Sequence, residues 1–353
     1  MMTANFSAGP DGSSLPCPPA EVEDFLSRPS TEVQDVLART PGTILVLGAG
    51  GKIGLHLSMM IRRALDSLGR RDQVVAVSRF STLRDRGDFE QRGVITQPCD
   101  LADARRLAQL PDASTIFFLA GAKFGTADSP DVLRKVNVEM PKMVIERFPK
   151  ARFVVFSTGC VYPFVSPQSG GATEDTPPAP VGDYAVSCLQ RERVFASASQ
   201  RHGNPVALIR LNYSMEFRYG VLVDIAQRVL RGEPVDVTMG HVNVIWQTDA
   251  ITHAIRALDI ARSPAAPINV TGPDTLAVKS LARRVGELLG RPVRTTGTEA
   301  QTAWLSSAAR AHRLFGLPAT SPETMMAWIA AWLSKGGKTW GKPTRFERRD
   351  GRY

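Results

Sequence analysis

Residues 43–54 read TILVLGAGGKIG, and this stretch decides the fold. An apolar run at 43–47 passes directly into a glycine-rich turn, and an apolar helical pattern follows from Leu55 to Leu65. A strand, a glycine turn and a helix in this order predict a dinucleotide site, although a plain strand-to-helix turn is the alternative. We expect Gly48 to allow the tight turn, Gly51 to let the backbone approach a pyrophosphate and Gly54 to let helix and strand pack closely. Lys52 and Ile53 lie in the same turn and join the predicted cofactor site.

Short apolar runs recur along the rest of the chain, with helical patterns between most of them. They cover Thr43–Leu47, Gln73–Val77, Thr115–Leu119, Arg152–Phe156, Pro205–Arg210 and Ala266–Val270. Strands that alternate with helices and are apolar throughout indicate a parallel sheet covered on both faces. The predicted fold class is therefore α/β, a Rossmann-type doubly wound parallel sheet with a smaller C-terminal substrate-binding region.

Composition indicates an ordinary globular protein. The chain has 353 residues, of which 43% are hydrophobic and 22% charged. No apolar run approaches the roughly 18 residues of a membrane span, and no secretion signal is recognisable, so we expect a cytoplasmic protein. The four cysteines show no C-x-x-C pairing, which favours thiols over disulfides or structural zinc.

The net charge of +9 is concentrated at the C-terminus. Residues 335–353 hold seven Lys or Arg and two acids. This basic tail favours a solvated or subunit-contacting terminus over a nucleic-acid function. Residues 1–40 are expected to form an extension with a flexible lead-in and short helices.

The end of the second apolar run bears on the choice of cofactor. An enzyme that uses NAD is expected to place an acid there, on the adenosine ribose. This chain has Ser78 and Arg79 instead. A guanidinium suits a 2′-phosphate, so NADP is favoured over NAD, with a surface arginine as the alternative interpretation.

Several further segments, together with the glycine turn, resemble motifs of the extended short-chain dehydrogenase/reductases, the NAD-dependent epimerase/dehydratase family. They are Cys99-Asp100-Leu101, Ala120-Gly121-Ala122-Lys123, Asn137, the S-[ST]-x-x-V-Y block at 157–162, the Y-x-x-S block at 184–187 and Arg210-Leu211-Asn212-Tyr213. The resemblance covers about residues 43–334. It implies cofactor contacts from Asp100, Leu101, Ala120, Gly121, Lys123, Asn137, Tyr184 and Cys188, and substrate contacts from Thr158, Asn212 and Glu216.

The resemblance also implies a mechanism. Tyr184 would exchange the proton at a carbon–oxygen bond while hydride moves to or from the nicotinamide, and Thr158 would hold the substrate oxygen. A homodimer through the helices around Tyr184 is implied as well. The domains expected on this basis are a Rossmann domain at 41–215, to which 242–272 returns, and a substrate-binding region at 216–241 and 273–334.

The chain departs from the family at Cys188, where a lysine is expected four residues after the tyrosine. That lysine binds the nicotinamide ribose and lowers the pKa of the tyrosine. Without it, only about one tyrosine in a thousand is ionised at pH 7, which hinders oxidation more than reduction. Three hypotheses follow: a silenced site that binds a nucleotide as a regulator or scaffold, rescue by Lys123, or altered chemistry that uses a thiol.

Cys160 is the candidate thiol. It precedes Val161-Tyr162-Pro163, an arrangement similar to the GDP-fucose synthase branch, where a cysteine acts as acid/base in epimerisation; a small buried cysteine is the alternative. Glu216 is a candidate to replace the partner histidine of that branch, but a solvated loop glutamate is the favoured interpretation. The stretch 233–248 contains no arginine for a diphosphate, which favours a small sugar, sugar acid or lactone over a sugar nucleotide. The sequence thus predicts an NAD(P)-dependent oxidoreductase or epimerase acting on a small carbohydrate-like substrate.

Overall fold

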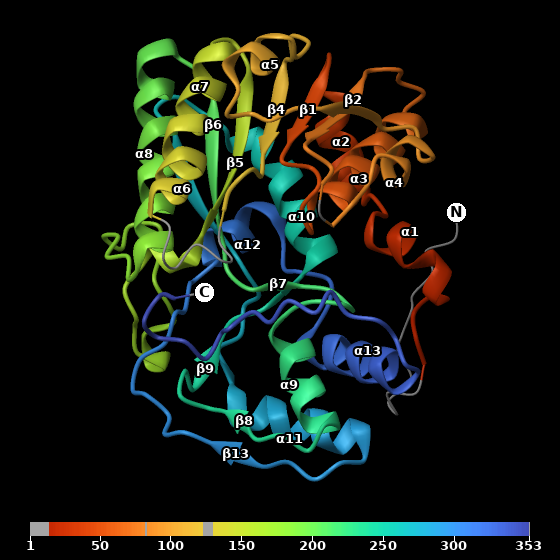
Figure 1. Cartoon of the computed structure of the whole chain (residues 1–353), viewed down its shortest axis with the longest axis vertical. Helices are drawn as coiled ribbons and strands as arrows, with labels where there is room; N and C mark the ends of the chain where they lie inside the picture. The colour runs from red at the N-terminus through yellow and green to blue at the C-terminus, as the bar shows by residue number, and fades with distance from the viewer. Residues whose placement is uncertain (1–13, 82, 123–129, 353) are drawn as a thin grey trace.

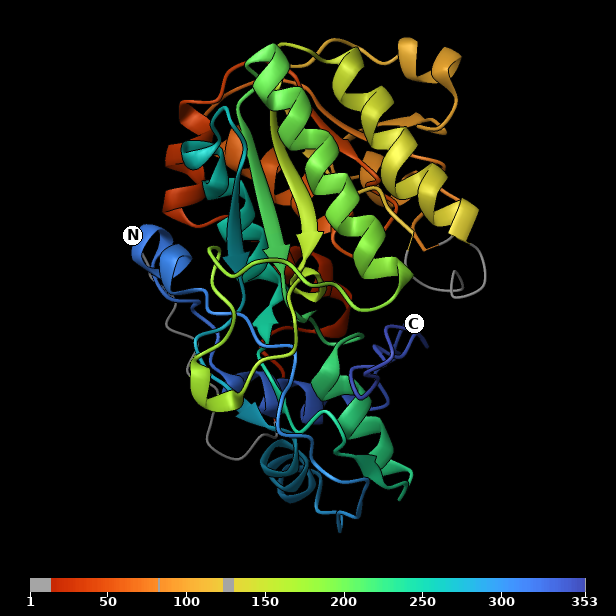
Figure 2. The same cartoon turned by 90° about the vertical axis from the view of Figure 1, so that its left-hand side faces the viewer.

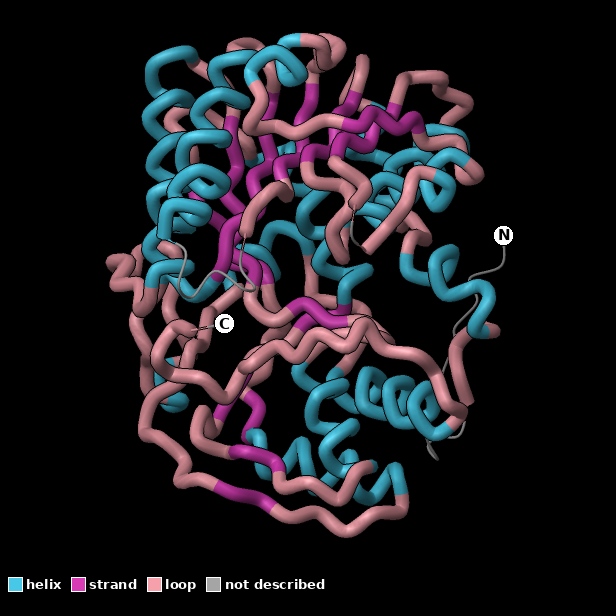
Figure 3. Tube along the Cα trace, viewed as in Figure 1, coloured by secondary structure: helices cyan, strands magenta, loops and turns pink. Residues whose placement is uncertain are grey.

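Seven strands form one parallel sheet in the order β11-β6-β5-β4-β1-β2-β3. The structure is a computed structural model, and it describes residues 14–81, 83–122 and 130–352. The strands are β1 (Ile44–Leu47), β2 (Val74–Ser78), β3 (Ile95–Pro98), β4 (Thr115–Phe118), β5 (Arg152–Thr158), β6 (Val206–Leu211) and β11 (Ala266–Val270). The order runs outward from β1 in both directions, so the predicted doubly wound α/β fold is confirmed. Figure 3 shows the strands gathered in the upper half of the molecule.

Six of these strands coincide with the six predicted apolar runs, and β3 is the one that the pattern missed. It lies at the edge of the sheet, paired only with β2, and none of its residues is buried. An edge strand of this kind needs no continuous apolar run, and it tolerates Pro98.

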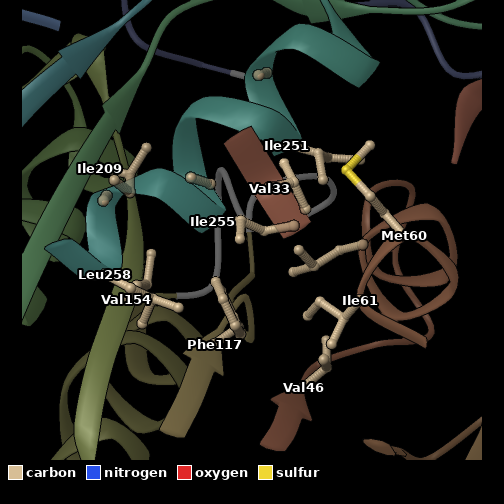
Figure 4. Close-up of a cluster of buried hydrophobic side chains, with 14 of the residues drawn as sticks. Val33, Val46, Met60, Ile61, Phe117, Val154, Ile209, Ile251, Ile255 and Leu258 are labelled. Carbon is tan, nitrogen blue, oxygen red and sulfur yellow. The ribbon is translucent and has the colours of Figure 1, made fainter. Parts of the chain in front are cut away.

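Helices cover both faces of the sheet, and alternate residues of β1 supply the two cores. Ile44 and Val46 face the core formed with α2, α3, α10 and α12, whereas Leu45 and Leu47 face the core formed with α5, α7 and α8. Figure 4 shows the first core, where Val33 of α2 and Ile251 and Ile255 of α10 meet side chains of the strands. Figure 2 shows α7 and α8 side by side on the other face.

The helices named so far have the following bounds: α2 (Thr31–Ala38), α3 (Gly54–Ser67), α5 (Ala104–Ala108), α7 (Met140–Arg147), α8 (Asp183–His202), α10 (Gln247–Arg256) and α12 (Ala309–Phe315). The position of α12 differs from the sequence interpretation, which placed all of 273–334 in the substrate-binding region. Ala311 and Phe315 are buried in the core of the sheet, so this helix packs on the strands.

A second, smaller core lies below the sheet in Figure 1. It contains α9 (Val221–Leu230), α11 (Val278–Leu289) and α13 (Pro322–Ser334), together with α1 (Val22–Leu26) from the N-terminal extension. Phe217, Trp246 and Trp328 pack against one another at its centre, with ring centroids 5.0 to 6.2 Å apart. Two short strand pairs form separate ladders: β7 (Ser214–Met215) is parallel to β10 (Ile245–Trp246), and β9 (His241–Val242) is antiparallel to β12 (Leu276–Ala277).

The C-terminal segment, residues 335–352, runs across the molecule between the two regions (Figure 1). Phe346 is 2% exposed, and the guanidinium groups of Arg84 and Arg218 lie 4.8 and 4.5 Å from the centroid of the Trp340 ring. Six of the seven basic residues of this segment are exposed, as a solvated terminus predicts, whereas its two aromatic side chains dock on the same chain. A subunit contact by this segment stays a prediction. None of the described helices combines the length and apolarity needed to cross a membrane.

Candidate active site

The glycine turn has the geometry that the sequence predicts at two of its positions. Gly48 has a φ of +84°, and a Cβ there would lie 2.5 Å from the backbone nitrogen of Ala120. A Cβ on Gly54 would lie 2.2 Å from the carbonyl oxygen of Ala49. Only glycine fits either position, so the tight turn at Gly48 and the close packing of α3 at Gly54 are confirmed. A Cβ at Gly51 would meet only an oxygen 3.5 Å away, so the protein itself does not demand a glycine there.

A cavity of about 250 Å³ opens along the carboxyl ends of β1, β2 and β4. It brings together eight residues that were predicted to contact a cofactor: Gly48, Gly51, Ser78, Arg79, Asp100, Leu101, Ala120 and Gly121. Arg79 is exposed at this cavity, and the Asp100 carboxylate accepts a hydrogen bond from the backbone of Ala102 at 3.0 Å. Carboxyl ends of parallel strands are where doubly wound sheets bind their ligands.

A second cavity, of about 270 Å³, continues from the first and shares Gly48, Gly51, Leu119 and Gly121 with it. Its other walls include Lys52, Ile53, Ser157, Tyr184 and Arg191. The two cavities together form one cleft over the ends of the strands, which reaches from Arg79 to Tyr184.

A third pocket, of about 210 Å³, adjoins the second on the side of the smaller region. Tyr184, Lys52 and Ser157 line both. The pocket adds three predicted site residues and several hydroxyl groups that were not predicted: Thr158, Cys160 and Asn212, with Tyr213, Ser214, Tyr219 and Thr344. Tyr184 thus lies at the junction of the nucleotide cleft and the pocket.

Buried polar groups hold the floor of this junction. The Ser157 hydroxyl donates to Glu192 at 2.5 Å, and Glu192 forms an ion pair with Arg210 at 2.7 Å. Arg210 also donates to the Tyr162 hydroxyl at 2.7 Å. These buried groups form hydrogen bonds with one another in place of water. The network fixes the end of β5 and therefore the position of Thr158.

Two residues predicted to contact ligands use their side-chain amides for hydrogen bonds within the protein. Asn137 is fully buried and bonds both the nitrogen and the oxygen of Ala122 at 3.0 Å, and it donates to Ser187 at 2.9 Å. It therefore ties the segment after β4 to α8. Asn212 lines the pocket and donates to the Trp304 carbonyl at 3.3 Å.

Helix α8 carries Tyr184, Cys188 and Arg191 toward the cleft. Burial, above all, raises the pKa of Tyr184 well above its usual value, the neighbouring thiols of Cys188 and Cys160 add to the rise, and Arg191 opposes it. Cys188 is fully buried, and its sulfur lies 3.5 Å from a guanidinium nitrogen of Arg191. Arg191 was not among the residues predicted from the sequence; the available signal was its place three residues after Cys188, on the same face of the helix.

Glu216 is the predicted site residue that the structure places elsewhere. It is 2% exposed, pairs with Arg218 at 3.0 Å and accepts a hydrogen bond from the Trp340 indole at 2.8 Å. It lies in an ion-pair cluster around Glu23, so the interpretation of a solvated loop glutamate is wrong, and the role of acid/base at the substrate is not supported. Lys123 lies outside the described residues.

Two further residues line the pocket: Lys52, which was predicted for the cofactor site only, and Thr344, which was not predicted. The Lys52 ammonium lies 3.1 Å from the centroid of the Tyr219 ring, and Lys52 lines both the cleft and the pocket. Thr344 comes from the C-terminal segment, where its nitrogen and hydroxyl bond the Asp224 carboxylate at 2.7 and 2.6 Å. The tail is therefore part of the wall of the pocket.

A profile of the NAD dependent epimerase/dehydratase family matches residues 44–257, more than half of the chain. The chain belongs to this family. The matched part begins at β1, includes the glycine turn and Tyr184, and ends just after α10.

Solved structures resemble the chain over most of its length. They include a UDP-galactose 4-epimerase, with a TM-score of 0.67 and 22% identity over 83% of this chain and 99% of that chain. A UDP-glucuronic acid 4-epimerase from Bacillus cereus in complex with NAD has a TM-score of 0.70 and 19% identity, over 84% and 100%. An epimerase from Methanothermobacter thermautotrophicus has a TM-score of 0.70 and 19% identity, over 87% and 96%. Identities this low show a shared fold. No curated protein matches the sequence.

Proposed function

We propose that the chain is an NAD(P)-dependent oxidoreductase or epimerase that acts on a small carbohydrate-like substrate. The observation that carries this proposal is the position of Tyr184, which lines both the nucleotide cleft and the adjoining pocket. A proton donor or acceptor at this junction can act on a substrate carbon–oxygen bond while hydride crosses from one cavity to the other.

The cofactor proposed for the cleft is NADP in preference to NAD. Arg79, exposed at the adenine end, suits a 2′-phosphate, and no acid follows β2 to bind an unmodified ribose. The glycine turn supplies backbone nitrogens for the pyrophosphate. The Bacillus cereus neighbour holds NAD, so both nucleotides belong in the test.

Three residues carry the proposed chemistry at the substrate. Tyr184 is the acid/base, and its raised pKa favours the protonated form, which suits donation of a proton during reduction. Thr158 anchors the substrate oxygen from the end of β5. Cys160, 6% exposed and in the wall of the pocket, is a second acid/base for exchange of a proton on the adjacent carbon.

The composition of the pocket supports a small polyhydroxy substrate. Lys52 is the one charged side chain among the described residues that line it, and the remaining polar groups are mostly hydroxyls and amides. A diphosphate normally needs several fixed donors or cations, whereas a sugar, sugar acid or lactone needs hydroxyl and amide partners and at most one cation. Two of the neighbours named above are a UDP-galactose 4-epimerase and a UDP-glucuronic acid 4-epimerase, so a UDP-sugar is the comparison substrate for any assay.

The test is a calorimetric titration with NAD⁺, NADH, NADP⁺ and NADPH, followed by a turnover screen of sugars, sugar acids and lactones with the nucleotide that binds. Tyr184→Phe should abolish turnover and leave the affinity for the nucleotide within about threefold. Absence of binding to all four nucleotides would contradict the proposal, and so would unchanged turnover in the tyrosine variant.

The second candidate is a regulator or scaffold that binds a nucleotide without turnover. Cys188 favours it, because a fully buried thiol occupies the position where the family is expected to have a charged lysine. Such a protein would bind a nucleotide and show no turnover, and Tyr184→Phe would leave partner binding intact.

The resemblance also leads us to propose a homodimer through α7 and α8. Val186 of α8 is 39% exposed, which gives this helix an apolar side chain at its surface. Light scattering coupled to gel filtration gives the mass, and Val186→Glu should shift a dimer to a monomer.

A further inference from the structure

Arg191 is a buried arginine in the wall of the nucleotide cleft. It is 5% exposed and shares the second cavity with Tyr184 and the glycine turn. One guanidinium nitrogen lies 3.4 Å from the carbonyl oxygen of Ala120, and the other lies 3.5 Å from the sulfur of Cys188. The side chain therefore runs from α8 over Cys188 toward the end of β4.

The positive charge of Arg191 is not balanced by an ion pair within the described part of the chain. Its Nε is buried without a hydrogen-bond partner there. Arg210, which is 6% exposed, forms an ion pair with Glu192 at 2.7 Å, as a buried arginine normally does. Because an uncompensated buried charge is costly, the partner of Arg191 is expected to come from outside the chain or from ionisation of a neighbour.

We propose that Arg191 is the cation of this site and replaces the family lysine that is missing at Cys188. It would hold the ribose on the nicotinamide side of the cofactor and stabilise the ionised form of Tyr184. This inference rests on the proposed function, because both tasks belong to a site that binds a nicotinamide nucleotide next to a tyrosine.

The helix geometry makes such a replacement possible. Residues at spacings of four and three lie on one face of a helix, so Tyr184, Cys188 and Arg191 follow one another along α8. A Cβ on Gly121 would lie 2.7 Å from a guanidinium nitrogen, so the glycine at this position leaves room for the arginine. The small thiol beneath leaves room for the longer side chain to pass.

The electrostatic surroundings of Tyr184 agree with this role. The ionisable groups beside Tyr184 come from three elements: Cys188 and Arg191 of α8, Cys160 after β5 and Lys52 of the glycine turn. Burial, above all, raises the pKa of Tyr184, the two thiols add to the rise, and Arg191 is the neighbouring group that opposes it. A guanidinium also keeps its charge when it is buried, which a lysine often does not.

Four variants test the proposal, with two measurements on each. They are Arg191→Met, Arg191→Lys, the double variant Cys188→Lys with Arg191→Ala, and the control Arg105→Met, at an exposed arginine of α5. The first measurement is the affinity for whichever of NADH and NADPH the wild type binds more tightly, by calorimetry. The second is the pH profile of turnover with the substrate found in the screen.

Arg191→Met should weaken nucleotide affinity at least tenfold and move the basic limb of the pH profile up by one unit or more. Arg191→Lys should recover part of both losses. The double variant, which restores the lysine of the family, should return the affinity to within about threefold of wild type. Arg105→Met should change neither quantity.

The proposal would be overturned if the nucleotide affinity of Arg191→Met stayed within twofold of wild type and its pH profile shifted by less than 0.3 unit. A loss in Arg191→Met that the double variant fails to recover would also overturn it, because Arg191 would then not be acting as a replacement for the lysine. The melting temperature of nucleotide-free Arg191→Met should not fall, since the change removes an unbalanced buried charge; unchanged melting separates loss of binding from misfolding.

The outcome separates this inference from the proposed function. If the wild type binds a nucleotide but turns over nothing, the affinity series still decides the role of Arg191 while the enzymatic proposal fails. If turnover depends on Tyr184 and is indifferent to Arg191, the enzymatic proposal stands and this inference fails.

Discussion

Glu23, in the N-terminal extension, should be one of the largest single contributors to stability. Its carboxylate accepts hydrogen bonds from Arg84 at 2.8 Å and Arg218 at 2.7 Å, and it also contacts His56. The Glu23 side chain is 16% exposed and those of Arg84 and Arg218 are 5% and 12% exposed. This one carboxylate therefore joins the extension, the helix α3 of the sheet region and the segment that carries Glu216.

Glu23→Ala should lower the free energy of unfolding by about 3 kcal/mol. Removing one partner of a buried ion pair typically costs about 3 to 5 kcal/mol, because the remaining charges stay buried. The lower end applies here because Arg218 keeps Glu216 as a partner at 3.0 Å. Urea denaturation followed by circular dichroism gives the value.

The adjacent residue Asp24 provides a matched control. Its side chain is 58% exposed, and its ion pairs with Arg63 and Arg92 are 3.8 and 4.0 Å long. Asp24→Ala should change the free energy of unfolding by less than about 0.5 kcal/mol. A cost below about 1 kcal/mol for Glu23→Ala, or equal costs for the two variants, would refute the reasoning.

The effect of Glu23 should also depend on pH. Its arginine and histidine partners hold the pKa of Glu23 far below the usual value of about 4.3. A carboxyl whose pKa is lowered by folding stabilises the protein above its unfolded pKa and loses that contribution as the pH falls. The difference between wild type and Glu23→Ala should therefore be complete at pH 7 and shrink progressively below about pH 4.3.

Three further variants probe other parts of the structure. Gly48→Ala should abolish nucleotide binding in calorimetry, and it should lower the free energy of unfolding more than Gly203→Ala does. Both glycines have a positive φ, of +84° and +76°, but only at Gly48 would the added Cβ lie 2.5 Å from a backbone atom. Arg79→Asp should change the ratio of KM for NADPH to KM for NADH at least tenfold in favour of NADH, and an unchanged ratio would remove the argument for the 2′-phosphate. Burial, with help from His312 and Arg256, lowers the pKa of His253 to about 4, so folding keeps this histidine neutral. The free energy of unfolding should therefore fall as the pH drops from about 6.5 to 4, and the fall should be about 2 to 3 kcal/mol larger in wild type than in His253→Gln. Urea denaturation at a series of pH values measures both, and an equal fall in the two proteins would contradict this.

The parts of the fold that the sequence predicted are those that short-range physics controls. Apolar runs become buried strands because both faces of a parallel sheet are covered, and Gly48 and Gly54 are recognisable because a strand precedes the turn and a helix follows it. β3 escaped prediction because an edge strand is exposed and carries no apolar run.

Glu216 and the C-terminal tail could not be placed from the sequence, because their positions depend on partners far along the chain. Glu216 is buried through Arg218 and Trp340, and Arg218 in turn needs Glu23, 195 residues earlier. A local pattern of one glutamate in a loop contains no trace of these partners. The same holds for Thr344, which reaches the pocket because the Asp224 carboxylate bonds its nitrogen and hydroxyl.

The motif on α8 that begins at Tyr184 predicts only part of the charge in the cleft. The missing lysine at Cys188 is evident from the sequence, and judged alone it indicates a silenced site. The structure adds that Arg191, three residues further, brings a permanent positive charge into the same cleft as Tyr184. Because the guanidinium keeps its charge across the physiological pH range, a site built on Arg191 should retain its cation at alkaline pH, where a buried lysine would have lost its proton. The loss of a motif residue therefore argues against activity only when no other side chain on the same helix face can supply its charge.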